Sequence, residues 1–191
     1  MNPIMREIPY TFDTERLTIR GPLPGDGLVV RTAVLESQDA LKPWMPWAVN
    51  VASEQEYEIR VREGQIKYLA REDFWLLIFL KGSDTLIGCS GLHDPNWQVP
   101  SFEIGYWLHT AHTGQGYITE AVNGICRFAF THLEAQRLLI RCDSENERSA
   151  AVARRCGFNF EGTHRHDSRD HITNELASTH YFSRLAGWDT D

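Results

Sequence analysis

The amino-acid sequence predicts an α+β fold, with a mixed and mostly antiparallel sheet of six to seven strands flanked by about four helices. Two observations lead to this class. Apolar segments with strand-like patterning alternate with segments whose apolar residues recur at helical spacing. In addition, some consecutive strand candidates are joined by short turns and others by helices, which mixes antiparallel and parallel pairing in one sheet.

The first third of the chain predicts one strand and two helices. The strand covers 15–20, where β-branched residues alternate before the breaker-rich GPLPGDG. A helix follows from about 26 to 38. The next segment, LKPWMPW, holds two prolines and two tryptophans and predicts an irregular aromatic loop. Ser53 precedes Glu56 by three residues, as in a capping box, and starts a helix over about 54–71.

The middle of the chain predicts three neighbouring strands and a long helix. The apolar runs 74–80 and 85–92 are joined by KGSD, which carries hairpin-turn residues. A third strand at 102–108 follows the turn-rich HDPNWQVPS. The helix begins behind the glycines of HTGQGYITEAV, and its apolar residues keep helical spacing: Ile118, Ala121, Val122, Ile125, Ala129 and Leu133.

The last third predicts a strand over 137–143 and a short helix in NERSAAVARRCGF that Gly157 ends as its C-cap. Residues 158–185 then fit two strands around a polar hairpin loop. No internal repeat, low-complexity tract or linker interrupts the chain. We therefore expect one domain over residues 1–191.

Composition narrows the function classes. The chain has 191 residues, 42% of them hydrophobic, which suits one domain with a substantial core. Its formal net charge is −7, whereas proteins that bind phosphate backbones present a basic face, so we expect no direct nucleic-acid partner. An acidic surface favours cationic molecules such as amines, although the same charge also serves solubility alone.

Cysteine spacing and apolar runs predict a cytoplasmic protein. The four cysteines show neither zinc-site spacing nor a disulfide framework, as is typical of reduced thiols: Cys89, Cys126, Cys142 and Cys156. The N-terminus lacks the apolar core of a signal peptide, and the longest apolar run is far too short to cross a membrane. We expect no membrane association.

Two glycines, Gly114 and Gly116, precede the long helix. Backbone N–H groups at a helix start form an anion site, and glycine lets an anion approach the main chain. A dinucleotide fingerprint would need a third glycine at Thr119, and a Walker loop would need Gly-Lys-Ser or Gly-Lys-Thr, which the chain lacks. From these residues alone, an anion site and a simple tight turn both remain open.

Several motifs, taken in order and spacing, resemble the Gcn5-related N-acetyltransferases (GNAT), and more narrowly the RimJ/RimL branch that acetylates N-termini of ribosomal proteins. The motifs are TERLTIR, PWMPW, IGCSGL, FEIGYWL, GQGYITEA, RLLIRCDSENERSAAVARRCGF, EGTHRHD and YFSRL. They cover the chain from about Thr14 to Leu185. The resemblance implies a single-domain GNAT fold and an enzyme that moves an acetyl group from acetyl-CoA to a primary amine by direct attack on the thioester.

The resemblance also implies which residues bind acetyl-CoA. The glycine loop would hold the pyrophosphate through its main chain: Thr113, Gly114, Gln115, Gly116, Tyr117, Ile118 and Thr119. The family pattern has Gln or Arg where this chain has Thr113, and Gly or Ala where it has Ile118. These departures leave a non-catalytic acyl-CoA sensor as an alternative function. Asn146 would bind the pantetheine arm, and the main chain at Trp107 and Leu108, where two strands splay, would donate to the oxyanion.

Candidate catalytic residues follow from the same resemblance. Many relatives use a tyrosine acid where this chain has Ala153, so Ser149 would protonate the departing thiolate instead. A serine three residues after Asn146 is also ordinary N-cap chemistry. For the base, Glu103 is the charged residue of an apolar strand, and simple alternation onto a wet face is its alternative. A second acidic candidate follows EGT, either Asp167 or Asp170, and both also fit a solvated loop.

The acceptor is expected to be an N-terminal α-amino group, such as that of a ribosomal protein. An α-amino group has a pKa near 7.7–8.0 and a lysine near 10.4, so a neutral lysine costs roughly 3.5 kcal/mol more at pH 7. Trp44 and Trp47 would line the acceptor groove, although tryptophan is also common in cores. A small amine, such as a polyamine, an aminoglycoside or an amino-acid derivative, is the alternative acceptor.

No metal site is expected. His164, His166 and His171 are close in sequence, but no clear carboxylate or cysteine partner set accompanies them, and a solvated hairpin explains them. The sequence leaves open whether the protein is a monomer or a homodimer.

Overall fold

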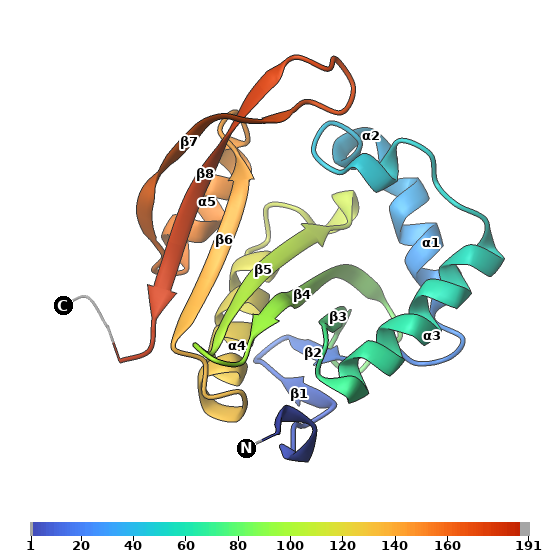
Figure 1. Ribbon diagram of the computed structural model, residues 1–191. Coiled ribbons are helices and arrows are strands. Elements are labelled where there is room, and N and C mark those ends of the chain that lie inside the picture. Colours follow the sequence, from blue (N-terminus) through green and yellow to red (C-terminus); the bar gives the residue numbers. More distant parts are fainter. Residues whose placement is uncertain (1, 188–191) are drawn as a thin grey trace.

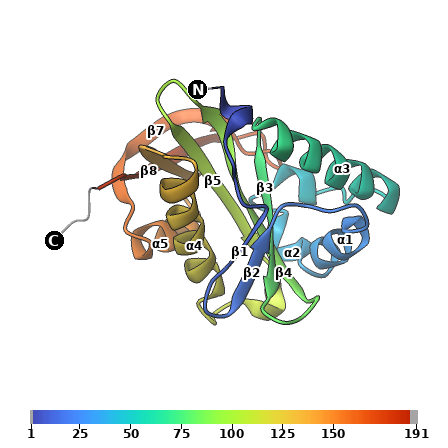
Figure 2. The ribbon, with the colours of Figure 1, turned by 90° about the horizontal axis from the view of Figure 1, so that it is seen from below.

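The computed structural model describes residues 2–187 and shows one sheet with helices on both faces (Figures 1 and 2). The strands are β1 (Thr11–Asp13), β2 (Leu17–Arg20), β3 (Phe74–Leu80), β4 (Leu86–Asn96), β5 (Ser101–Leu108), β6 (Arg137–Asp143), β7 (Asn159–Arg169) and β8 (Leu176–Leu185). They lie in the order β1-β2-β3-β4-β5-β6-β8-β7. Neighbours pair antiparallel except β5 and β6, which are parallel. The predicted mixed, mostly antiparallel sheet is confirmed.

Five α-helices and three short 3-10 helices complete the described chain. The α-helices are α1 (Gly27–Glu36), α2 (Gln38–Leu41), α3 (Glu54–Ala70), α4 (Tyr117–His132) and α5 (Glu147–Arg155). The 3-10 helices are η1 (Pro3–Met5), η2 (Pro46–Ala48) and η3 (Thr110–His112). The capping box predicted for α3 is present, since Ser53 Oγ accepts from Glu56 N and the Glu56 carboxylate accepts from Ser53 N.

The element count differs from expectation in two places near the N-terminus. The sheet has eight strands within residues 2–187, because the three-residue β1 pairs with β2 at the sheet edge, and a segment this short leaves no alternation to detect. The helix expected over 26–38 ends at Glu36, and α2 follows as a separate turn. In the predicted aromatic loop, Pro46 begins η2, where its missing N–H is not needed.

Strand β4 is longer than predicted. It runs to Asn96, through residues that the sequence marks as a turn. The pairing with β5 shifts register between His93 and Asn96, and Asp94 adopts a left-handed φ of +49°. A bulge of this kind lets Pro95 sit in a strand, because the irregular ladder does not need its N–H.

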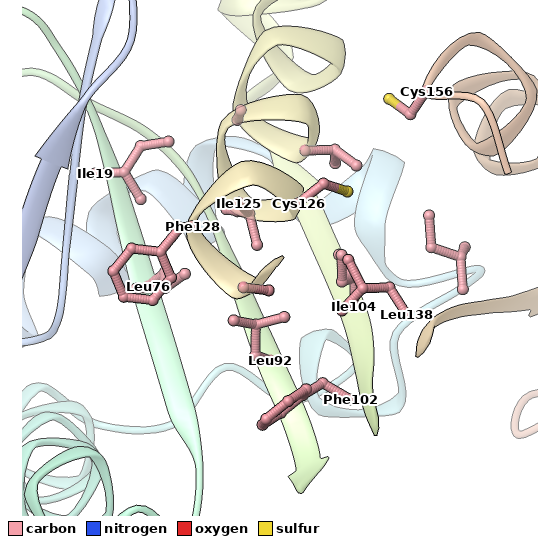
Figure 3. Packing of buried hydrophobic residues seen from close by; sticks show 14 of the residues in the cluster. Ile19, Leu76, Leu92, Phe102, Ile104, Ile125, Cys126, Phe128, Leu138 and Cys156 are labelled. Carbon is pink, nitrogen blue, oxygen red and sulfur yellow. The ribbon is translucent and has the colours of Figure 1, made fainter. Parts of the chain in front are cut away.

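The two faces of the sheet carry different helices (Figure 2). On one face, α4 and α5 cover the main apolar core, to which β5 contributes Phe102 and Ile104. Figure 3 shows Ile125, Cys126 and Phe128 of α4 packed over Leu92, Phe102 and Ile104. The helical spacing predicted for α4 is confirmed, with Ala121, Val122, Ile125, Ala129 and Leu133 buried. On the other face, α1 and α3 form a smaller cluster with β3 and β4.

Strands β5 and β6 separate soon after they begin. They pair in parallel over three positions, ending at Glu103 opposite Leu139, and then diverge (Figure 1). The separation therefore starts four residues before Trp107, earlier than the sequence suggests. The main chain of the second half of β5 lacks a β6 neighbour there, which leaves unpaired backbone groups beside the gap.

The β7–β8 hairpin reaches across to α2. Its tip approaches the α2 end of the molecule in Figure 1, and His171 Nε2 lies 2.8 Å from the carbonyl oxygen of Lys42. This contact joins two segments 129 residues apart in sequence. It closes one end of the open region between β5 and β6.

Candidate active site

The glycine loop has the geometry of an anion site. Gly114 and Gly116 have φ angles of +76° and +80°, in the left-handed region where residues with a Cβ are strained. Gly116 is the N-cap of α4, and no side chain within residues 2–187 caps this helix start. A Cβ placed on Gly114 would meet nothing within 4 Å, so the space beside the loop is open. The first N–H groups of α4 are therefore available to a phosphate.

Three side chains of this loop are held by neighbouring groups. Thr113 Oγ1 donates to the carbonyl of Thr110 at 2.9 Å. Arg16 stacks on Tyr117, with its guanidinium carbon 4.5 Å from the ring centroid. Thr119 Oγ1 accepts from Arg155 Nε at 3.3 Å, which brings a cation from α5 to the helix start. Two arginines thus flank a loop that lacks the long donor of the family pattern at Thr113.

Glu120 fastens the loop to the beginning of β2. Its carboxylate accepts from Arg16 Nε at 2.6 Å, from Arg16 N at 2.8 Å and from Thr14 Oγ1 at 2.6 Å. Burial disfavours the charged form of Glu120, but these hydrogen bonds outweigh it and lower the pKa of the carboxyl. Arg16 also donates to the carbonyl of Gln115 at 3.1 Å, inside the loop.

A cavity of about 360 Å³ occupies the gap between β5 and β6. Trp44, Tyr106, Asn146 and Ser149 contribute to its wall. The Tyr106 hydroxyl donates to the Ser149 carbonyl at 3.0 Å and lies 3.0 Å from Ser149 Oγ. Because the phenol hydrogen is engaged by that carbonyl, Ser149 Oγ can in turn donate to the phenol oxygen. Burial raises the pKa of Tyr106 well above its usual range, so the phenol stays protonated at neutral pH.

Asn146 is the N-cap of α5, as local chemistry predicts. Its Oδ1 accepts from Ser149 N at 3.0 Å. This hydrogen bond orients the side chain, whose amide NH₂ group remains a donor beside the cavity. Gly157 follows the end of α5 with a φ of +74°, one residue after the C-cap Cys156.

A second cavity of about 600 Å³ lies on the α1–α3 face of the sheet. Aromatic side chains dominate one part of its wall, where the rings of Trp47 and Trp107 are 6.1 Å apart. Tyr57 also lines it, and the Tyr57 hydroxyl is buried without a hydrogen-bond partner among residues 2–187. Charged residues from α3 and the following turn complete the wall: Arg60, Glu63, Lys67 and Asp73.

The two cavities meet at β5. Met45, Gly105 and Tyr106 border both of them. The structure therefore separates the two tryptophans expected at the acceptor groove. Trp47 lines the larger cavity, whereas Trp44 lines the cavity that also contains Ser149. The shared wall residues place the two cavities side by side at Gly105.

The acidic candidates are already engaged. Glu103 lies in an ion pair with Arg141, 2.7 Å from the guanidinium, at the edge of the smaller cavity. Asp167 accepts from Thr179 Oγ1 at 2.9 Å and lines neither cavity. Asp170 accepts from the backbone N–H groups of Ile172 and Thr173, which forms the turn of the β7–β8 hairpin.

The hairpin histidines point to separate partners. The His164 ring lies 4.0 Å from the Tyr181 ring, whereas His171 contacts the Lys42 carbonyl. Within residues 2–187, no group of three or more His, Cys, Asp or Glu side chains is arranged to hold a metal ion. No helix in the same range has the length and apolar character needed to span a membrane.

Three residues of the site were not identified from the sequence. Tyr106 is predicted only as part of a strand and His93 as part of a turn, and Asp73 lies between the predicted helix and strand with no role assigned to it. His93 Nδ1 lies 2.6 Å from Asp73 Oδ1 inside the larger cavity. Burial disfavours a charged imidazole, but Asp73 and Glu103 outweigh it and raise the pKa of His93. A histidine within the glycine-rich IGCSGLH segment was the available signal, because glycines beside a ring leave it room.

Comparisons with known proteins agree with this geometry. The family profile described as "Acetyltransferase (GNAT) domain" matches residues 16–159. A Bacillus subtilis (strain 168) protein named "Putative ribosomal N-acetyltransferase YdaF" is 32% identical over 149 residues, 78% of this chain and 80% of its own length. The "Ribosomal-protein-serine acetyltransferase" of Escherichia coli (strain K12) is 30% identical over 125 residues, 63% of this chain and 69% of its own.

The fold is also that of solved acetyltransferases. The structure titled RimL, a ribosomal L7/L12 alpha-N-protein acetyltransferase in complex with coenzyme A, superposes with a TM-score of 0.83. It is 21% identical, and the match covers 93% of this chain and 97% of that one. The chain therefore belongs to the GNAT acetyltransferase family and is an N-acetyltransferase that uses acetyl-CoA.

Proposed function

We propose that this enzyme acetylates the N-terminal α-amino group of a protein, such as a ribosomal protein. The observation that carries the proposal is the meeting of two cavities beside Gly105 and Tyr106. One cavity lies in the gap between β5 and β6, and the other, of about 600 Å³, lies on the α1–α3 face. Relatives named for ribosomal-protein acetylation support the acceptor class.

In this proposal the main chain and Asn146 hold acetyl-CoA. The loop 113–119 binds the pyrophosphate through backbone N–H groups, and Arg16 and Arg155 add positive charge beside it. Asn146 donates its amide NH₂ to the pantetheine arm while its oxygen caps α5. The β5 backbone N–H groups that face the gap, including that of Leu108, stabilise the developing oxyanion. The N–H of Trp107 faces β4 instead, because Trp107 pairs with Cys89 in step with the hydrogen bond from His109 N to the Ile87 carbonyl.

Ser149 is the proposed acid. Its hydroxyl protonates the departing thiolate, and the Tyr106 hydroxyl, 3.0 Å away, then turns its hydrogen from the Ser149 carbonyl to the oxygen that has lost its proton. Glu103 and Asp167 remain candidates for acidic side chains that assist deprotonation of the amine. Either would first have to leave a partner, Arg141 for Glu103 and Thr179 for Asp167.

The larger cavity suits an extended peptide end. Trp47 and Trp107 offer apolar surface to the first side chain, and the unpartnered Tyr57 hydroxyl offers a hydrogen bond to a peptide group. The protein is proposed to act as a single cytoplasmic domain over residues 1–191, as a monomer or homodimer, with no nucleic-acid or membrane partner.

Titration calorimetry with acetyl-CoA, followed by a free-thiol release assay, tests the proposal. The assay compares peptides that begin with serine or alanine, the same peptides with a blocked N-terminus and a single lysine, and a polyamine. Turnover that needs the free N-terminus supports the proposal. Preference for the polyamine would identify a small-amine acetyltransferase. Binding without turnover of any amine would favour a non-catalytic acyl-CoA sensor.

A further inference from the structure

The His93 ring lies over two glycines of the sheet. Gly91 of β4 and Gly105 of β5 face each other across the ladder, on the α3 side of the sheet. A Cβ at Gly91 would overlap the His93 ring at Cε1 and Nε2, and a Cβ at Gly105 would lie 3.5 Å from Nε2. The imidazole therefore occupies the space of two missing side chains, with Nε2 over the glycine pair.

Asp73 fixes the orientation of this ring. It lies in the turn between α3 and β3, and its Oδ1 is 2.6 Å from His93 Nδ1. A carboxylate can only accept a hydrogen bond, so Nδ1 carries the hydrogen of the neutral ring and Nε2 keeps its lone pair. Nε2 has no hydrogen-bond partner within residues 2–187. The side chain is 37% exposed, so the cavity reaches it.

The lone pair lies beside the point where the two cavities meet. Nε2 is over Gly105, and Gly105 borders both cavities. An amine entering from the α3 face therefore passes His93 before it reaches the gap between β5 and β6. In contrast, the carboxylate of Glu103, opposite His93 in the ladder, is held by Arg141.

Resting on the proposed function, we propose that His93 is the general base of the transfer and that Asp73 is its positioning residue. Nε2 takes one proton from the amine as the N–C bond forms and the C–S bond breaks. The Ser149 hydroxyl gives one proton to the departing sulfur, which leaves as the thiol. Solvent then removes the proton from His93 and restores the Ser149 hydroxyl, so one amine and one thioester yield one amide and one thiol.

The electrostatics of the cavity suit this role. Burial lowers the pKa of His93, whereas the hydrogen bond and charge of Asp73 and the charges of Glu103 and Asp94 raise it, and the net shift is upward from 6.5. Other charged groups lining the cavity are Arg60, Glu63 and Lys67 of α3. A base whose pKa lies near the working pH is the most effective one.

Two substitutions and one matched control test the role. His93→Gln removes the base, Asp73→Asn removes the positioning charge, and His132→Gln changes a histidine of α4 on the opposite face of the sheet. We measure kcat and KM with acetyl-CoA and a peptide beginning with serine, and the Kd of acetyl-CoA by calorimetry. His93→Gln should lower kcat by on the order of 10²-fold with the Kd unchanged, and His132→Gln should match the parent.

A pH measurement separates catalysis from a purely structural link. The His93 Cε1–H signal, followed by NMR in the full chain, should titrate at lower pH in Asp73→Asn than in the parent. The rise of kcat/KM with pH should move down with it, because the pKa of the peptide amine is the same in both. In His93→Gln this inflection should disappear.

The outcomes are distinct for the inference and for the proposed function. If the parent acetylates the peptide and His93→Gln does so equally fast, His93 is not the base and the proposed function stands. The same conclusion follows if the kcat/KM profile of Asp73→Asn does not move while the imidazole pKa does. If the parent acetylates no amine at all, the proposed function fails, and the base role fails with it.

Discussion

Strands β4 and β5 present two faces that differ in almost every respect. Toward α4, Leu92, Phe102 and Ile104 are fully buried and interlock with the helix (Figure 3). Toward α3, the alternate positions include Gly91 and Gly105, and a cavity opens above them. Because successive strand residues point to opposite faces, one short segment packs the core with one set of side chains and leaves a cavity open on the other face.

The largest expected effect is a loss of stability on the packed face. Phe102→Ala should lower the free energy of unfolding by about 3–5 kcal/mol, because a fully buried ring is lost and leaves a cavity. Its neighbour Glu103 points to the other face, and Glu103→Gln should cost no more than about 1 kcal/mol, since its partner Arg141 is half exposed. Urea unfolding of both variants checks the contrast. Similar losses at the two positions would refute the division between faces.

The next effect concerns activity alone. Ser149→Ala should lower kcat by on the order of 10²-fold without lowering the unfolding midpoint, because Asn146 Oδ1 bonds the backbone N–H of Ser149 and not its hydroxyl. Tyr106→Phe, which removes the phenol hydroxyl next to Ser149, should give a smaller loss. Steady-state kinetics and thermal melts of the two variants supply the test. A Ser149→Ala enzyme as fast as the parent would show that Ser149 is not the acid.

A matched glycine pair sharpens the assignment of the loop. Gly114 and Gly82 have φ angles of +76° and +75°, and a Cβ on either meets nothing within 4 Å. Alanine at each should therefore cost a similar strain of about 1–2 kcal/mol. Gly114→Ala should also raise the Kd of acetyl-CoA, by up to about tenfold if the strain is felt in the bound state. Gly82→Ala, in the β3–β4 turn, should leave that Kd unchanged. Equal acetyl-CoA affinities in calorimetry would remove the loop from the coenzyme site.

The smallest expected effect is a change in the pH dependence of stability, at Glu161 in the edge strand β7. Hydrogen bonds from Arg137 lower the pKa of Glu161 to about 2, against the burial that opposes its charge. A carboxyl with a depressed pKa stabilises the fold above its unfolded pKa and loses that contribution as pH falls from about 4.5 toward 2. Stability should thus fall over this range, and less steeply in Glu161→Gln. Parallel slopes for the two proteins in acid titrations of unfolding would contradict the assignment.

Much of the fold could be predicted because the spacing of apolar residues and the turn and capping residues are local features of the sequence. The α4 stripe, the Ser53 capping box and the hairpin at KGSD are each encoded within a few neighbouring residues. The glycine loop could be predicted for the same reason, since its two glycines and the start of α4 are adjacent positions. The short β1 and the end of β4 could not be predicted, because β1 is too short to show alternation and the end of β4 carries a proline inside a bulge.

Residues of the candidate site come together from distant parts of the sequence, and this explains why some of them could not be predicted. Tyr106 reaches Ser149 across 43 residues, and Asp73 reaches His93 across 20. Neither pair can be found without the strand register, because a slip of one residue would turn Tyr106 and His93 to the opposite faces. Trp44 and Trp47 were predicted as one group, yet three residues of separation place them in different cavities.

The Arg16–Glu120 contact has a consequence for how the protein reaches its active state. The residues that fasten the glycine loop to β2 are 104 positions apart, so this contact forms only when the N-terminal strand has docked. Contacts of such long separation form late, after the cost of closing a large loop has been met. A nascent chain that has emerged only as far as α4 already contains both partners, and acetyl-CoA would favour their joining by binding the docked form alone.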